Sequence, residues 1–276
     1  MILRYLIVRE SAYMNIIFKK VKKIFSQEVI CIIIIIIPLF FQDSWIELIK
    51  KIFESWNGTT INQDVTSIIV KTILIVILYG CVVKFNSKRE FFNGDVYGDI
   101  PICFYYIAKI LGYKKISLIR KPYDIQFKVL RRDLFEIVED NIEKDENVNV
   151  EIDKTNFKYS NNMRECNLII ADTYSISKNQ IPENKRSLDA IWIKREKSVI
   201  ATRVYSPKLI NAVSESAALI QKTGAKINLF LTTNTKNTER IIKEVFMKGD
   251  RSIYNIEIFL QESDKNRCFK DKGIKV

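Results

Sequence analysis

Two long hydrophobic segments near the N-terminus constrain the fold of this chain more than any other feature. The first is predicted over residues 25–42, where six consecutive isoleucines precede Pro38. The second is predicted over residues 65–83 and contains one charged residue, Lys71. A helix needs about 20 apolar residues to cross a bilayer, and neither segment has the polar face of a helix on a soluble core. We therefore expect a transmembrane hairpin over residues 25–84.

A cleaved signal peptide is the main alternative for the first segment. No small-residue cleavage site follows it, and a second apolar segment does, so the hairpin is the better interpretation. Pro38 interrupts the first segment and Lys71 is the one charge in the second, which makes these two the candidate membrane or pore residues.

The distribution of Lys and Arg predicts the orientation of the hairpin. Basic residues lie just before the first segment and just after the second, whereas the loop over residues 43–64 is net acidic. Positive charge is retained on the cytoplasmic side, so both termini are expected in the cytoplasm of a bacterium, with the chain in its inner membrane. Residues 1–24 are predicted to form a basic amphipathic segment on the inner surface.

The composition excludes several kinds of chemistry. The 276 residues contain no histidine, which removes Ser-His-Asp and Cys-His nucleophiles and His-liganded metal centres. The five cysteines form no CxxC pair, so neither a zinc site nor a disulfide framework is indicated. The net charge of +12 favours DNA, RNA, a nucleotide or anionic lipid as a partner. A chain rich in Ile, Lys and Asn is equally typical of an AT-biased genome.

Residues 90–276 are predicted to form one cytoplasmic α/β domain with a mixed sheet. The succession of strand, helix, strand, helix and strand in the final third indicates a sheet covered by helices. Residues 114–187 are less regular and stay without an assigned role. Helices are expected over residues 101–113, 124–145, 207–222 and 235–247, and strands over 115–119, 148–152, 167–171, 188–194, 199–205, 226–232 and 254–260.

The last third also carries short motifs in a familiar order. Asp189 opens one predicted strand, Arg203, Tyr205 and Ser206 end the next, and a helix then leads to Gly224-Ala225 and a strand ending in Thr232-Thr233-Asn234. This order resembles the catalytic domain of the Mrr-like restriction endonucleases, a branch of the PD-(D/E)xK nuclease fold. The resemblance covers roughly a quarter of the chain and implies a restriction-endonuclease-like domain after the hairpin.

The catalytic positions implied by this resemblance are degenerate. These nucleases bind Mg²⁺ through an aspartate and a Glu or Gln on the neighbouring strand, and a lysine two residues further on activates water. Asp189 matches the first position, but Ala201 occupies the second and Arg203 replaces the lysine. Alanine cannot ligate a metal and arginine stays protonated. The resemblance therefore implies a broken nuclease site at Asp189 and Arg203, without a bound metal or other firm cofactor.

Two rescues of the nuclease site stay open. Glu183-Asn184-Lys185 is a Glu-x-Lys triplet eleven residues after Asp172, although it lies in a polar stretch that favours a loop. Alternatively, a carboxylate from an upstream helix, such as Asp99 or Glu136, would have to enter the site.

Three further residues are the candidate ligand-binding positions, namely Asp172, Tyr205 and Thr232. Asp172 follows a buried strand, and open α/β sheets bind ligands outside the carboxyl ends of their strands.

These features predict a membrane-anchored effector or sensor, of the kind used in antiviral defence, that acts through the hairpin, with a second copy of the chain in a homo-oligomer as a candidate partner. Its nuclease-like domain would bind nucleic acid or a nucleotide signal. One alternative is a membrane-tethered, Mg²⁺-dependent DNA endonuclease. The other is a non-enzymatic membrane protein that binds a protein partner.

Overall fold

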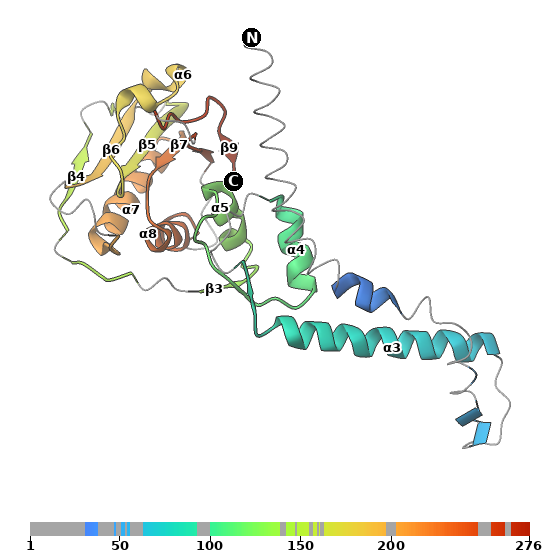
Figure 1. Cartoon of the computed structure of the whole chain (residues 1–276). Helices are drawn as coiled ribbons and strands as arrows, with labels where there is room; N and C mark the ends of the chain where they lie inside the picture. Colours follow the sequence, from blue (N-terminus) through green and yellow to red (C-terminus); the bar gives the residue numbers. More distant parts are fainter. Residues whose placement is uncertain are drawn as a thin grey trace, which may run out of the picture. The chain divides into compact units, whose positions relative to one another are not determined.

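A computed structural model shows the fold (Figure 1) and describes residues 31–37, 47, 51–52, 54–55, 63–92, 100–138, 142–146, 148–154, 157–158, 160, 163–196, 203–247, 255–262 and 266–276. The chain divides into two compact units, which are described separately below. Unit 1 comprises residues 1–91 and 103–115, and unit 2 comprises residues 92–102 and 116–276. The predicted amphipathic segment over residues 1–24 and Pro38 lie outside the described residues, as does most of the first predicted span.

The main element of unit 1 is the helix α3 (Gln63–Asn86). Its segment Ser67–Asn86 is long and apolar enough to cross a membrane, and in the described part of the chain it is the one helix that is. Large side chains along α3, among them Ile68 and Val76, are exposed. Residues 31–36, within the first predicted span, are also helical. The second predicted span is therefore a helix of membrane-spanning type, and the two-span hairpin stays a prediction.

A short helix, α4 (Ile102–Ile110), packs against the C-terminal end of α3 within unit 1. The buried Asn86 side chain donates to the Leu111 carbonyl (2.9 Å), and the Tyr79 hydroxyl donates to the Ile110 carbonyl (2.9 Å). Gly112 follows α4 with φ +93°, and a Cβ atom there would lie 2.6 Å from the Cα of Val83. Glycine at this position therefore permits the close approach of the two helices.

Unit 2 contains a six-stranded mixed sheet in the order β4-β6-β5-β7-β8-β9. The four central strands are mutually parallel, and the two edge strands run antiparallel to their neighbours. This confirms the predicted mixed-sheet α/β architecture. The strands are β4 (Val150–Asp153), β5 (Glu165–Ala171), β6 (Ala190–Arg195), β7 (Lys226–Leu231), β8 (Ile256–Phe259) and β9 (Ile274–Lys275).

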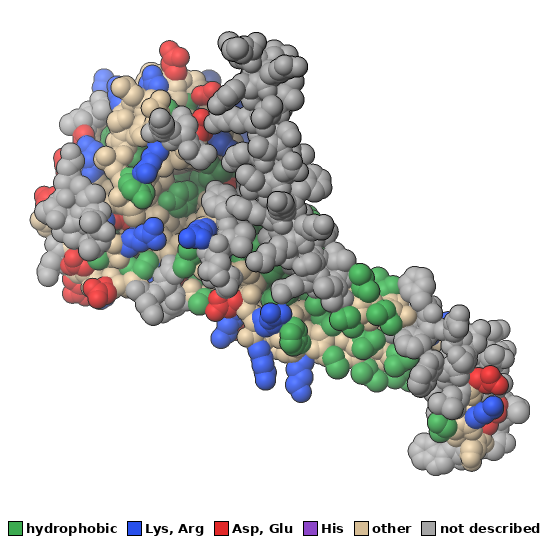
Figure 2. All heavy atoms as spheres, in the orientation of Figure 1, with side chains coloured by type: hydrophobic (Ala, Val, Ile, Leu, Met, Phe, Trp, Pro, Cys, Tyr) green, Lys and Arg blue, Asp and Glu red, His purple; other side chains and the backbone are tan. Residues whose placement is uncertain are grey.

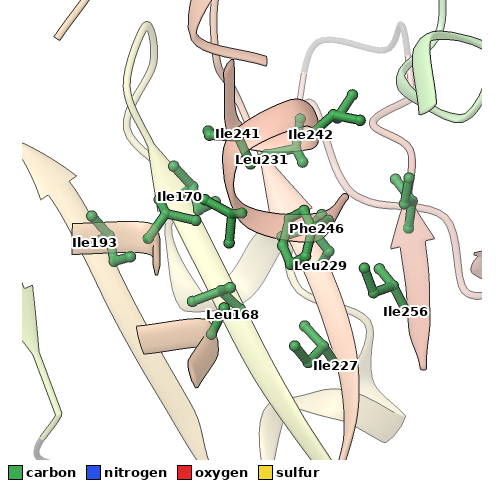
Figure 3. Close-up of a cluster of buried hydrophobic side chains, with 14 of the residues drawn as sticks. Leu168, Ile170, Ile193, Ile227, Leu229, Leu231, Ile241, Ile242, Phe246 and Ile256 are labelled. Carbon is green, nitrogen blue, oxygen red and sulfur yellow. The ribbon is translucent and has the colours of Figure 1, made fainter. Parts of the chain in front are cut away.

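One face of this sheet carries the larger hydrophobic core (Figure 3). Leu168 and Ile170 of β5 lie on this face, because successive side chains of a strand point to opposite faces. The face is covered by four helical elements: α5 (Tyr123–Arg131), α7 (Pro207–Gln221), α8 (Thr235–Arg240) and η4 (Ile241–Phe246), which continues α8 in π-helical form. The helix predicted over residues 207–222 is confirmed as α7, and the Ser206 hydroxyl caps it by accepting from the Leu209 amide (3.3 Å) before Pro207.

The opposite face is covered by shorter elements. Ile169 and Ala171 of β5 pack here with Ile176, Ile181 and the C-terminal Phe269. The elements of this cover include η2 (Lys178–Gln180) and α6 (Glu183–Arg186). Both faces of the central strands are thus buried, which explains their almost continuous apolar sequence.

One predicted element is wrong, and another lies mostly outside the described residues. The helix expected over residues 124–145 ends at Arg131, because Asp133 adopts φ +46° and a short strand, β3 (Glu136–Ile137), follows. Of the strand expected over residues 199–205, residues 199–202 lie outside the described residues, and in the described part Tyr205 makes an isolated parallel bridge with Lys144. The two short strands β1 (Glu90–Phe91) and β2 (Lys115–Ile116) complete the described elements.

The pairing of β6 also departs from the nuclease expectation. Its two neighbours are β4 and β5, and no described residue of the segment 199–205 pairs with β6. Side chains that follow β7 hold this segment instead: the Val204 carbonyl accepts from Asn234 (2.8 Å) and Asn237 (3.1 Å). A backbone carbonyl that already accepts hydrogen bonds from side-chain amides does not require a hydrogen-bond donor in a neighbouring strand.

Candidate functional site

A buried ion pair lies at the carboxyl ends of β5 and β6. Asp172 directly follows β5 and Arg195 ends β6, with 3.1 Å between Asp172 Oδ1 and Arg195 Nε. Their side chains are 0% and 1% exposed. Burial raises the pKa of Asp172, whereas the amide of Asn237 and the charge of Arg195 favour its ionised form. This pair, shielded from water, joins the carboxyl ends of β5 and β6.

Asn237 connects this pair to the two following segments. Its Nδ2 donates to Asp172 Oδ2 (2.9 Å) and to the Val204 carbonyl, while its Oδ1 accepts from the Ser206 amide (3.1 Å). The backbone and side-chain amides of Asn234 also lie 3.3 Å from Asp172 Oδ2. These hydrogen bonds and the ion pair form one polar network, which joins the carboxyl ends of β5 and β6 to the segments that follow β7 and precede α7. Sequence reasoning missed Asn237 and Arg195, because only the fold places them beside Asp172.

The candidate ligand-binding residues all lie at this edge of the sheet. β5 and β7 are adjacent, yet the chain leaves them toward opposite faces, which is the point where open α/β sheets bind ligands. Here the side chains bond to the protein itself: the Thr232 hydroxyl donates to the Tyr174 carbonyl (2.7 Å). The Arg240 guanidinium lies 5.8 Å from the ring centroid of the half-buried Tyr205. Ligand binding by Asp172, Tyr205 and Thr232 stays a prediction.

An open cavity of about 530 Å³ lies on the other face of the same sheet. We call it the basic cavity. Ile169 of β5 and Trp192 of β6 are among its walls, and the η2–α6 segment closes one side. Its volume lies within the range of small-molecule sites. The lining residues are Asp153, Lys158, Asn167, Ile169, Ile176, Lys178, Ile181, Arg186, Ser187, Leu188, Asp189, Ala190, Trp192 and Lys194.

The charge of the basic cavity is positive, with four cationic and two anionic residues in its wall. Arg186 is committed to the protein, since its guanidinium donates to the carbonyls of Ile181 (2.7 Å) and Asn179 (2.8 Å). The three lysines, Lys158, Lys178 and Lys194, have no carboxylate within ion-pair distance among the described residues. The cavity therefore presents free ammonium groups to an anion.

Trp192 gives the cavity an aromatic surface beside these charges. It is half-buried, and the ammonium of Lys194 lies 5.6 Å from its ring centroid. Trp192 and Lys194 share one face of β6, because the alternating residues Ile191 and Ile193 point into the opposite core. The i, i+2 spacing of Trp192 and Lys194 within a predicted strand was the sequence signal that could have indicated this pairing.

The structure does not bring the two degenerate nuclease positions together. Asp189 precedes β6 at the amino end of the strand, lies in the wall of the basic cavity, and accepts from the Lys158 amide (3.3 Å). Arg203 is exposed and precedes Val204, which is bonded to the network at the opposite, carboxyl end. In the described parts of the chain, no three acidic or cysteine side chains come together as a metal site. We derive no metal-dependent step.

The remaining candidates are dispersed. Lys71 lies in the third turn of α3 and is half-buried, whereas Asp99 lies outside the described residues. Glu136 is exposed in β3. The Glu183-Asn184-Lys185 triplet forms most of the short helix α6 rather than the loop that was expected, and Lys185 forms an ion pair with Glu165 at the start of β5.

The fold and these sites define an α/β protein that carries a helix of membrane-spanning type. The model of one protein family, the SMODS- and ubiquitin system-associated 2TM effector domain (SUa-2TM), matches residues 9–276. The chain belongs to this family, an effector domain associated with defence signalling systems. The family name denotes transmembrane helices, and no comparison supports the Mrr-like resemblance. No curated protein matches the chain.

Solved structures give only distant similarity. A structure of the Acinetobacter baumannii Cap4 SAVED/CARF-domain containing receptor with the cyclic trinucleotide 3'3'3'-cAAA shares 10% identity, with a TM-score of 0.41 over 67% of this chain and 46% of that chain. A second structure of the same receptor, with 2'3'3'-cAAA, shares 9% identity, with a TM-score of 0.38 over 64% and 44%. This chain thus spans less than half the length of either.

Proposed function

We propose that this protein is a membrane-anchored defence effector whose α/β unit receives a nucleotide signal in the basic cavity and acts through its membrane-spanning segment. The observation that carries the proposal is the cavity itself: three lysines without ion-pair partners among the described residues surround an accessible tryptophan. A nucleotide has an aromatic base that can stack on Trp192 and phosphates that the ammonium groups attract.

The size of the cavity favours a small nucleotide over a nucleic acid duplex. About 530 Å³ accommodates a small molecule, whereas a duplex is bound on an extended surface. The effector family and the apolar helix α3 support the proposed action at the membrane. If the protein has two conformations that differ in its membrane-spanning segment, the ligand would favour the conformation that binds it more tightly. The size of this shift equals the difference between the two binding free energies.

Trp192 itself offers the test. It is one of three tryptophans, so a Trp45→Phe, Trp56→Phe double variant reports on the cavity alone. Addition of cyclic and linear oligonucleotides and mononucleotides to this protein in detergent should quench the Trp192 fluorescence for the cognate ligand. In calorimetric titrations, Trp192→Ala should weaken binding by roughly 5- to 150-fold, as removal of a stacking platform costs about 1–3 kcal/mol. Lys194→Gln should weaken it severalfold.

The matched control is Lys222→Gln, which removes an exposed lysine at the end of α7, outside the cavity wall. It should bind the ligand as the parent protein does. The output is measured as ligand-dependent loss of membrane potential in proteoliposomes, which Trp192→Ala should abolish. Failure of every nucleotide to bind would contradict the proposal, and it would favour the alternative of a membrane protein whose partner is another protein.

A further inference from the structure

A second cavity lies in unit 1, beside the C-terminal end of α3. It has a volume of about 420 Å³, and apolar side chains dominate its wall, including Ile34 from the first helical segment and Leu78, Val82 and Phe85 from α3. Arg89 also lines it. A continuous apolar groove of this kind, on the flank of a membrane-spanning helix, fits a hydrocarbon chain.

A second hollow of about 630 Å³ adjoins this groove. The two share Cys81, Phe85 and Arg89, and the second adds Lys84 and Lys88. Figure 2 shows apolar side chains along α3 and basic side chains gathered at one of its ends. An apolar groove therefore leads directly to three cations.

These cations have no competing ion-pair partner among the described residues. Among the described residues, Lys84, Lys88 and Arg89 form no ion pair. The Arg89 guanidinium is held 4.9 Å from the ring centroid of Phe85, so it stays at the mouth of the groove. Lys84 lies in the last turn of α3, and Lys88 lies in the turn that follows the helix. Three fixed positive charges next to an apolar groove complement a molecule with an anionic head and an acyl chain.

We propose that this surface binds one anionic glycerophospholipid, with an acyl chain in the groove and the head group on Lys84, Lys88 and Arg89. The proposal rests on the membrane location of the family and is independent of the nucleotide signal. Basic residues next to a membrane-spanning helix attract anionic lipids, and the groove adds a binding site for the chain, which a diffuse basic surface lacks. Each bound lipid would fix the end of α3 relative to the head-group layer.

Native mass spectrometry of the full chain in detergent tests this proposal, with dioleoyl phosphatidylglycerol and dioleoyl phosphatidylcholine as probes. The two lipids share their acyl chains and differ in head-group charge. The parent protein should bind one phosphatidylglycerol in preference to phosphatidylcholine. A Lys84→Gln, Lys88→Gln, Arg89→Gln variant should lose roughly a hundredfold in affinity, because each cation near an anionic surface contributes about fivefold.

A second variant tests the groove without changing charge. Ile34→Trp fills the space beside α3 and should reduce phosphatidylglycerol binding at least tenfold, while the three cations stay in place. The matched charge control is Lys222→Gln, Lys270→Gln, Lys272→Gln, which removes three exposed lysines of unit 2. This control should bind lipid as the parent protein does, and circular dichroism should show equal helix content in all variants.

Three outcomes would overturn the proposal. The first is equal affinity for the two lipids, and the second is equal loss in the charge variant and its control. The third is unchanged binding by Ile34→Trp, which would indicate diffuse attraction to a basic surface instead of a groove site. If the triple variant does not fold, two measurements replace it: phosphatidylglycerol binding by Arg89→Gln alone, and the salt dependence of phosphatidylglycerol binding by the parent protein. An affinity for phosphatidylglycerol that does not fall as the salt concentration rises would also overturn the proposal.

Discussion

The side-chain amide of Asn237 connects several buried polar groups of the α/β unit. It bonds at once to a buried carboxylate, a backbone carbonyl and a backbone amide, and it is fully buried. Each of these groups is far from water, so none can replace the lost bond with a solvent molecule. Buried polar groups left without partners are costly, and the cost is largest beside a charge.

Asn237→Ala should therefore destabilise the protein by about 3 kcal/mol, since it removes one charge-assisted and two backbone hydrogen bonds. Urea denaturation of the full chain in detergent, followed by circular dichroism, measures this change. Asn184→Ala, an exposed position in α6, is the control and should stay within about 0.5 kcal/mol of the parent. Equal effects of the two substitutions would show that the network does not bear on stability.

Glu165 is the residue whose charge most clearly couples stability to pH. Partial burial acts to raise its pKa, but hydrogen bonds from Lys185, Lys226 and Asn228 outweigh this effect and lower the pKa to about 2. The group therefore stabilises the fold above its unfolded-state pKa near 4.5, and this contribution disappears as the pH falls toward 2.

Glu165→Gln should cost on the order of 1–2 kcal/mol at pH 7, because water screens a side chain that is 29% exposed. The difference between parent and variant should shrink between pH 4.5 and pH 2. Urea unfolding curves at pH 7, 4 and 3 measure it. A difference that is constant over this range would mean that the carboxylate is not ionised preferentially in the folded state.

At the scale of elements, several contacts constrain the junction of α3 and α4 in the described part of unit 1. It combines two long-range hydrogen bonds with a glycine in the left-handed region. Edge-to-face packing of Phe91 on Tyr105, with ring centroids 5.5 Å apart, completes it. These contacts hold the end of α4 against the end of α3.

Gly112→Ala should destabilise this junction by about 2–4 kcal/mol, because alanine disfavours φ +93° and its Cβ would meet the Val83 backbone at 2.6 Å. Gly80→Ala is the matched control: no atom lies within 4 Å of the added Cβ, and helical alanine is favourable. Hydrogen exchange over residues 102–111 should increase in the first variant and stay unchanged in the second. Equal protection in both would contradict the role given to Gly112.

At the scale of the whole molecule, the membrane topology is the central prediction. The basic residues on either side of the hydrophobic segments predict that residues 43–64 lie outside and that both termini lie in the cytoplasm. In a cysteine-free background, Ser44→Cys should react with a membrane-impermeant maleimide in intact spheroplasts. Ser187→Cys, in the wall of the basic cavity, should react only after lysis. The reverse pattern would invert the topology, and labelling of both in intact cells would exclude the hairpin.

Much of the α/β unit follows from local sequence. The helix at residues 207–221 was predictable from its Ser-Pro start, and the strands at 167–171 and 226–231 from continuous apolar runs. Such features depend on backbone preference and side-chain burial within a few residues. The nuclease resemblance failed for the opposite reason: its motifs are short, and strand pairing, which they do not encode, separates Asp189 from Arg203.

The sequence alone determined the hydrophobic segments, the basic residues that flank them and the mixed α/β character of the domain, because hydropathy, charge and periodicity are local properties. Only the tertiary structure decided which polar groups meet. It joined Asp172 to Arg195 and Asn237 across three strand ends, and it opened a basic cavity beside Trp192 on the other face of the sheet. These contacts join residues far apart in the chain, and strand order, which no local pattern specifies, is the physical reason that they form.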